Sequence, residues 1–83
     1  METHNTTGMT LSEIATTCPY LGQTVNLWRQ RQIALYAHPT NDRLVIAVGT
    51  TFDQSRRVVA IEARKAFATA LDYIAHGKVY TSQ

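Results

Sequence analysis

The chain has few of the residues that hold small proteins together covalently or through a metal. Its 83 residues include one cysteine, Cys18, and three histidines that lie far apart in the sequence. A single thiol cannot form an internal disulfide, so a disulfide-stabilised secreted scaffold is not expected. The histidines have no HxxxH spacing and the cysteine has no CxxC partner, which are arrangements typical of metal sites. We therefore expect no metal and no other cofactor.

Long hydrophobic runs are also missing. No apolar stretch approaches the ~20 residues of a membrane-spanning helix. The N-terminal METHNTTGM lacks the basic and apolar regions of a signal peptide. Charged residues make up 17% of the chain, whereas 45% of it is hydrophobic, which is sufficient for a folded core. These features predict a cytoplasmic protein of phage, plasmid or bacterial type, with no membrane partner.

Residue patterns for catalysis are absent as well. The four glycines are isolated from one another, so the chain has no glycine-rich phosphate loop. The carboxylates form no spaced pair, and Cys18 lies among apolar positions rather than beside a base that would activate it. We expect a non-enzymatic protein that has no small-molecule substrate.

An N-terminal helix is the first element that the sequence predicts. Thr10 and Glu13 have the spacing of a capping box, in which each side chain accepts a hydrogen bond from the backbone N–H of the other residue. Apolar residues follow at helical spacing. Pro19 ends the pattern because it disfavours helical backbone at Cys18.

Two strand patterns flank the turn sequence Pro39-Thr40-Asn41-Asp42. QIALYAH before it and RLVIAVGTT after it are rich in aliphatic and aromatic residues, as expected for an antiparallel hairpin. On one face of this hairpin we expect Ile33 and Leu35 together with Leu44, Ile46 and Val48.

The C-terminal part has the pattern of an amphipathic helix over residues 62–76. Its apolar stripe is expected to consist of Ala63, Phe67, Ala70, Leu71 and Ile74. The preceding RRVVAI, at 56–61, fits either the first turns of this helix or a third strand, because its β-branched residues favour a strand.

Together these patterns indicate an α+β fold in a single compact domain at residues 10–78, between flexible tails at 1–9 and 79–83. The expected order is an N-terminal helix, an antiparallel β-hairpin or three-stranded meander, and a long C-terminal helix packed on the sheet. Whether the N-terminal helix belongs to a helix-turn-helix depends on residues 23–32.

That segment, QTVNLWRQRQ, fits a helix better than a strand, and residues 20–22 before it are predicted to form a turn. As a helix, it places Val25 and Trp28 on one inward face. As a strand, it would align two arginines with two aliphatic residues on one side, which is a poorer pattern for burial. The helix is therefore favoured, and the strand stays open.

The helical interpretation gives the spacing of a helix-turn-helix. Ile14 and the small Ala15 lie in the first helix, and Val25 and Trp28 follow Ala15 by about ten and thirteen positions, where a second helix would face the first. Glutamine and asparagine on the outer side can read adenine edges, and arginine can contact phosphates. The candidate DNA-binding residues are Gln23, Thr24, Asn26, Arg29, Gln30 and Arg31, with Asn41 and Arg43 at the tip of the hairpin as a wing.

This layout resembles the excisionase and MerR-like winged-helix families over residues 10–50. The resemblance lies in Thr10-Leu11-x-Glu13, in Thr24-Val25-x-x-Trp28 and in the hairpin that follows Ile33. It implies a small DNA-binding regulator of transcription whose partner is duplex DNA.

A protein-binding module is the alternative function. With 56–61 as a third strand, an α-β-β-β-α fold would cover the surface of a host protein complex and inhibit or modulate it, as a phage anti-defence inhibitor does. Tyrosine and arginine are enriched at interface hot spots. The candidate interface residues are Tyr36, Arg56, Arg57 and Tyr73. A homodimer is compatible with either function.

Overall fold

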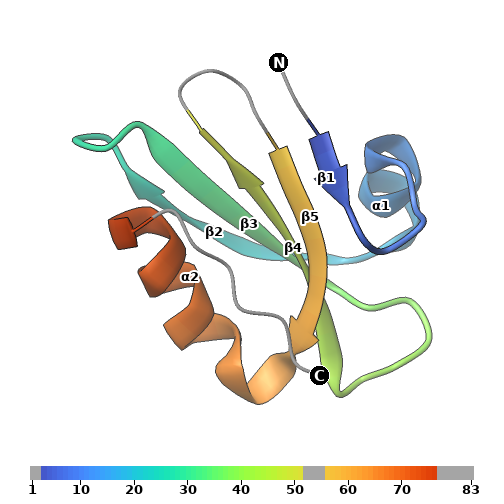
Figure 1. Cartoon of the computed structure of the whole chain (residues 1–83). Helices are drawn as coiled ribbons and strands as arrows, with labels where there is room; N and C mark the ends of the chain where they lie inside the picture. The colour runs from blue at the N-terminus through green and yellow to red at the C-terminus, as the bar shows by residue number, and fades with distance from the viewer. Residues whose placement is uncertain (1–2, 52–55, 77–83) are drawn as a thin grey trace.

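The computed structural model describes residues 3–51 and 56–76, which form one sheet with a helix on each face (Figure 1). In chain order the elements are β1 (Thr3–Asn5), α1 (Leu11–Thr17), β2 (Tyr20–Asn26), β3 (Arg31–Ala37), β4 (Leu44–Thr50), β5 (Arg56–Glu62), the 3-10 helix η1 (Ala63–Lys65) and α2 (Ala66–His76). The strand order is β1-β5-β4-β3-β2. The α+β class and both terminal helices are confirmed, and the antiparallel meander has four strands, β2 to β5, rather than two or three.

Each face of the sheet has its own core. On the first face, Ile33, Val45, Ala47, Val59 and Ile61 pack against Ala66, Ala70 and Tyr73. On the second face, Ile46 and Val58 pack against Ile14 and Cys18 of α1. Successive side chains of a strand point to opposite faces, so strands that are covered on both sides have nearly continuous apolar sequences. This accounts for the sequences of β4 and β5.

Helix α1 is capped as its sequence predicts. The backbone N–H of Glu13 donates to the Thr10 hydroxyl at 3.1 Å, and the Thr10 N–H donates to the Glu13 carboxylate at 3.0 Å. The helix ends before Pro19, and Cys18 has an extended backbone. Ile14 is 1% exposed and fixes the helix to the sheet.

Strands β3 and β4 confirm the predicted hairpin. One prediction about it is wrong, namely that Ile33 and Leu35 share a face with Leu44, Ile46 and Val48. The register pairs Leu35 with Ala47 and Tyr36 with Ile46. Leu44, Ile46 and Val48 therefore lie on the same face as Tyr36, and Ile33 and Leu35 lie on the opposite face. Both faces of the hairpin are apolar, so the hydrophobic pattern does not select between registers that differ by one residue.

The predicted turn at 20–22 and helix at 23–32 are wrong, and so is the helix-turn-helix built on them. Residues 20–26 form β2, residues 27–30 form a turn, and β3 begins at Arg31. Trp28, which the helix would have buried, is 92% exposed at the tip of the β2–β3 hairpin.

Local chemistry closes this hairpin. The Asn26 side-chain oxygen accepts the Arg29 backbone N–H at 3.1 Å, and the Gln30 N–H donates to the Leu27 carbonyl at 3.3 Å. Gln30 takes φ +54°, in the left-handed region that tight turns require. The objection to a strand also disappears, because Arg29 lies in the turn and Arg31 begins the next strand.

Helix α2 is confirmed, but its buried face is not the predicted stripe. Its buried residues are Ala66, Thr69, Ala70 and Tyr73, whereas Phe67 is 73% exposed. The Tyr73 ring lies directly over Gly49, where an added Cβ would be 2.6 Å from the ring carbon Cζ. Glycine at this point in β4 and small residues on α2 allow close packing, which turns the helix so that Phe67 points away from the core.

The N-terminal segment, expected to be a flexible tail, contributes β1, which pairs in parallel with the first half of β5. The Thr6 N–H extends this pairing by donating to the Val58 carbonyl at 3.0 Å. The strand alternative for 56–61 is correct. The predicted tail at 79–83 lies outside the described residues. Among the helices that the structure describes, none is long and apolar enough to span a membrane.

Candidate interaction surface

Helix α1 covers only part of the sheet face on which it packs. Its side chains Ile14 and Cys18 lie over Ile46 and Val58, on the inner strands β4 and β5. Figure 1 shows α1 at the β5 and β1 side of the sheet, whereas α2 crosses the opposite face toward β2. In the described part of the chain, the β2–β3 half of the α1 face therefore has no helix above it.

This uncovered half forms a groove of about 460 Å³, here called the open-face groove. Its floor includes Ala34 and Val48, which are cross-strand neighbours on β3 and β4. The other lining residues are Leu11, Ser12, Ile14 and Ala15 from α1, Tyr20 and Gln23 from β2, Gln32 and Tyr36 from β3, and Arg56 from β5. The groove thus combines an apolar floor with amide, hydroxyl and aromatic walls.

Two tyrosines form the aromatic wall of the groove. The β2–β3 register places Tyr20 opposite Tyr36. Their ring centroids are 5.5 Å apart at an interplanar angle of 63°, which is the favoured edge-to-face geometry. Tyr36 packs against the α1 core, whereas Tyr20 is exposed. The half-buried Tyr36 therefore holds the exposed Tyr20 in a fixed position.

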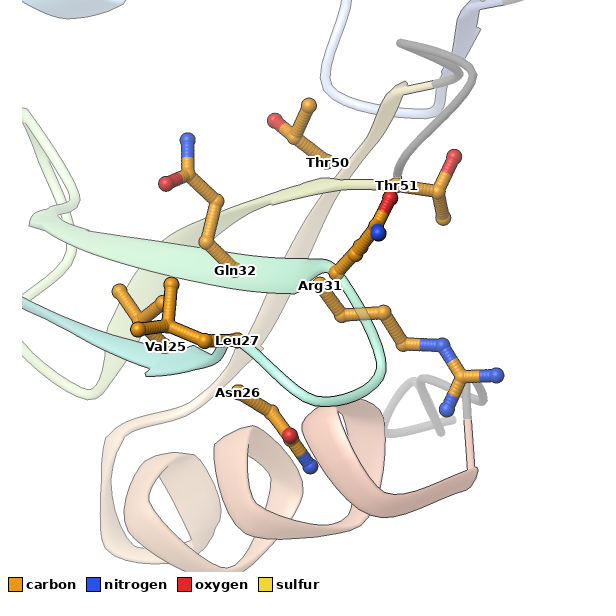
Figure 2. Close-up of a pocket in the computed structure, with 8 residues that line it drawn as sticks. Val25, Asn26, Leu27, Arg31, Gln32, Thr50 and Thr51 are labelled. Atoms are coloured by element: carbon orange, nitrogen blue, oxygen red, sulfur yellow. The ribbon is translucent and has the colours of Figure 1, made fainter.

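A second hollow, of about 290 Å³, continues from the groove toward the hairpin tip and shares Gln32 with it. Cross-strand register aligns Val25 and Gln32, and Figure 2 shows both pointing to the same side of the hairpin, while Asn26 points to the other side, toward α2. Leu27 and Trp28 follow at the tip, 83% and 92% exposed. Large apolar side chains therefore flank this end of the open face.

Among the described residues that line the open-face groove, Arg56 is the only charged one. Its neighbour Arg57 belongs to the opposite face of β5, because it pairs with Gly49 beneath α2. Glu13 lies on α1 outside the groove, and hydrogen bonds from Thr10 lower the pKa of its carboxyl. The groove is consequently positive at one end and neutral elsewhere.

The predicted DNA-binding residues do not form one surface. Gln23 lines the open-face groove, but Thr24 lies on the α2 side. Asn26 has a structural role, because its amide donates to the Ile74 carbonyl at 3.0 Å and its oxygen caps the turn. Arg29 and Gln30 are exposed in that turn. A recognition helix is therefore not available to bring them to base edges.

Arg31 and the predicted wing lie elsewhere. Arg31 begins β3, and its buried Nη1 atom has no hydrogen-bond partner within residues 3–51 and 56–76. Asn41 and Arg43 lie in the β3–β4 loop at the other end of the same strand. The Asn41 side-chain oxygen accepts the Arg43 N–H at 2.9 Å and shapes that loop. Both loop residues are thus separated by the length of β3 from the hairpin tip.

Two of the four predicted interface residues line the groove, at its opposite ends. Tyr36 and Arg56 both line it. Arg57 is exposed on the other face, and Tyr73 is buried beneath α2. Tyr20 was not among the predicted interface residues, because residues 20–22 were predicted to form a turn. The consecutive β-branched residues Thr24 and Val25 were the signal that favoured a strand.

Within the described ranges, no group of three or more histidine, cysteine or carboxylate side chains is placed to hold a metal ion. His38 is used locally, because its Nδ1 accepts the backbone N–H groups of Thr40 and Asn41 at 3.2 and 3.1 Å. The chain matches no protein-family model, no curated protein and no solved structure. Its function must therefore be inferred from its own surface.

Proposed function

We propose that the protein is a non-enzymatic protein-binding module that holds its target on the open face of the sheet. The observation that carries this proposal is that Tyr20, Tyr36 and Arg56 all line one groove, with the two tyrosines at one end and Arg56 at the other. Tyrosine and arginine supply much of the energy of protein interfaces when they lie in pockets that a partner closes. The apolar tip at Leu27 and Trp28 extends the same contact surface beyond the groove.

The groove also indicates the chemistry of the target. Arg56 offers a forked donor that suits a carboxylate, while Gln23 and Gln32 offer amide donors and acceptors. The apolar floor and the tyrosine rings suit an aliphatic or aromatic side chain. The fitting target is a protein segment that carries an acidic residue next to an apolar one, on a host complex that the module covers and thereby modulates.

Matched charge reversals on β5 test this proposal. Arg56→Glu reverses the charge in the groove, and Arg57→Glu makes the same change on the next residue of the same strand but on the other face. With a photo-reactive residue replacing Gln32, we expect one dominant host protein to be cross-linked, and Arg56→Glu to reduce the yield at least about tenfold. Arg57→Glu should leave the yield within about twofold.

Equal losses from the two reversals would contradict a groove-centred contact, because they would indicate only an effect of net charge. Circular dichroism of both variants checks that each is folded. Duplex DNA provides the competing outcome. Binding that weakens steeply between ~50 and ~200 mM salt, and that Arg29→Ala reduces for every sequence, would support the DNA-binding function instead.

A further inference from the structure

The outer edge of β2 is open in the described part of the chain. Among the strands that the structure describes, β2 is the last of the sheet and pairs only with β3. It contains neither a charged residue nor a proline. A bulge at its first residues leaves a regular ladder from Gly22 to Asn26. Monomeric proteins commonly protect such edges with lysine, proline or a covering element, so this edge is suited to pair with another strand.

An apolar stripe of α2 accompanies this edge; it is exposed at Phe67 and Leu71, and its third residue, Ile74, is partly buried against the core. Phe67, Leu71 and Ile74 lie on one side of the helix, because residues three, four and seven apart share a helical face. Phe67 and Leu71 are 73% and 44% exposed. The α2 sequence AFATALDYIAH contains one acidic residue and is apolar on nearly all sides. A helix of this kind is normally covered on more than one face.

The stripe lies on the β2 side of the helix. The Asn26 amide holds the Ile74 carbonyl at 3.0 Å, which fixes the C-terminal half of α2 to the end of β2. Near the start of the helix, Leu21 of β2 lines the same pocket as Ala63, which is one helical turn before Phe67. Figure 1 shows α2 running along the β2–β3 side of the sheet. The stripe and the open edge therefore form one continuous surface.

We propose that a second copy of this chain occupies that surface. The two β2 strands pair antiparallel about a two-fold axis, and the two α2 stripes pack against each other on one face of the joined sheet. A two-fold interface uses the same patch on both copies. Here the patch is self-complementary, since it joins a strand edge to a strand edge and an apolar stripe to an apolar stripe.

The spacing of the elements fits this arrangement. Paired strands lie about 4.8 Å apart, so a helix above β2 and β3 lies roughly 5 Å from the two-fold axis. Two such helices would be about 10 Å apart, which is the usual distance between packed helices. Phe67 and Leu71 would fill the space between them. The two-fold dimer can therefore form without a movement of α2 relative to its own sheet.

The charge and size of the patch also favour a second copy. Each chain carries a net charge of +2, but neither the β2 edge nor the stripe carries a charge, so like charges do not meet there. A strand of seven residues is about 24 Å long, and a sheet layer plus a helix layer is about 20 Å deep. The contact would bury roughly 1,000 Å² in total, near the lower limit for a specific interface.

This dimer is independent of the open-face groove, which lies on the other face of the sheet. Joining the β2 edges places two grooves on the same side of one continuous sheet. A target that presents two matching segments would then bind both grooves of the dimer. Its apparent affinity would be higher, because binding to the first groove places the second segment at a high local concentration near the second groove.

Sedimentation of the purified chain tests the proposal without any target. At about 100 μM, a concentration that populates dimers of micromolar affinity, we expect twice the 9.3 kDa of one chain. Phe67→Lys should raise the dissociation constant about 30-fold or more, because it places a charge in the centre of the contact. Ala68→Lys adds the same charge to the next exposed residue, about 100° around the helix, and should change it by less than about threefold.

A monomer at that concentration would overturn the proposal, and so would a dimer that both lysine variants weaken equally. Hydrogen exchange on the wild-type chain gives a second readout that does not depend on a variant. Backbone amides of β2 should become more protected as concentration rises, while those of β5 stay unchanged. Concentration-dependent protection confined to β1 and the second half of β5, which form the other edge of the sheet, would also overturn the proposal.

Discussion

The two faces of the sheet are built differently, although they belong to the same strands. The α2 face has a continuous core of eight buried residues, in which Tyr73 of the helix lies against Gly49 of the strand. The α1 face has a core of four buried residues, and the rest of that face is the open-face groove. The first face therefore supplies most of the packing energy, and the second leaves aromatic and cationic side chains open to a partner. Stability and recognition are thus assigned to opposite sides of one sheet.

The largest effect of a single substitution is expected on the α2 face, at Gly49. A Cβ at this position would be 2.6 Å from the Tyr73 ring, and valine would add two further methyl groups. Gly49→Val should lower the free energy of unfolding by about 3 kcal/mol, because the ring is held between helix and sheet and has little room to move. Chemical denaturation measures this loss.

A double-mutant cycle locates the cause. In a Tyr73→Ala background, the additional cost of Gly49→Val should fall by about 1 kcal/mol or more, since the ring that meets the new side chain is gone. Additive losses would show instead that valine disturbs the β4 backbone and not the contact with α2.

A smaller loss is expected on the α1 face, at Ile14. This side chain is buried between α1 and the sheet, so Ile14→Ala should cost about 2–3 kcal/mol. The value lies toward the low end for isoleucine because the site borders the groove, where water and neighbouring side chains can fill part of the space. Ala15→Gly, at the exposed neighbour, is the control and should cost about 1 kcal/mol through helix propensity alone. Equal losses would indicate that α1 is held by something other than Ile14.

The N-terminal cap of α1 gives the next smaller effect and a dependence on pH. Thr10→Ala should cost about 1 kcal/mol at neutral pH, because it removes the hydroxyl that accepts the Glu13 N–H. Hydrogen bonds from Thr10 hold the pKa of Glu13 below its ordinary value of 4.5. A carboxylate with a lowered folded-state pKa stabilises the fold above its unfolded-state pKa, and this contribution is lost as the pH falls through the folded-state value.

The stability difference between wild type and Thr10→Ala should therefore shrink below about pH 4.5. Glu13→Gln keeps an amide oxygen that can accept the Thr10 N–H but has no titrating carboxyl. The stability difference between Glu13→Gln and the Thr10→Ala/Glu13→Gln double variant should not change over the same range, because neither has a carboxyl at position 13. Thermal unfolding, followed by circular dichroism between about pH 3 and about pH 7, measures both stability differences. If the stability difference between wild type and Thr10→Ala grew as the pH fell, the predicted direction of this pH dependence would be wrong.

The elements with local signals were predictable from the sequence. The capping box marked α1, the Pro-Thr-Asn-Asp turn marked the β3–β4 hairpin, and helical periodicity marked α2. The register of the hairpin and the buried face of α2 were not predictable in the same way. Both depend on a contact between distant residues, in which Tyr73 requires a glycine at position 49.

The largest error concerned β2, where the sequence pattern fits two structures. Val25 and Trp28 are three residues apart, so they can share a helical face, whereas the hairpin places Val25 on a strand and Trp28 in a turn. What decides between them is the pairing of β2 with β3 and the hydrogen bonds of Asn26, which join it to residue 29 and to α2. The β2 side of the open-face groove could not be predicted for this reason, because Tyr20 was assigned to a turn and Gln23 to a DNA-reading helix. Tyr36 and Arg56 were found because tyrosine and arginine are favoured at interfaces whatever the fold.

The smallest effect is expected at the tip of the β2–β3 hairpin, and it separates the two structures most directly. On a helix-turn-helix, Trp28 would belong to the core, and its replacement would cost about 3–5 kcal/mol. On the hairpin it is 92% exposed, so Trp28→Ser should change the free energy of unfolding by no more than about 0.5 kcal/mol. Trp28 is the single tryptophan of the chain, so fluorescence gives an independent measurement. Acrylamide should quench its emission almost as strongly in the folded chain as in the denatured one. A shielded tryptophan in the free chain at low concentration would restore the helical structure, whereas shielding that appears only when a target is added would place Trp28 at the interface.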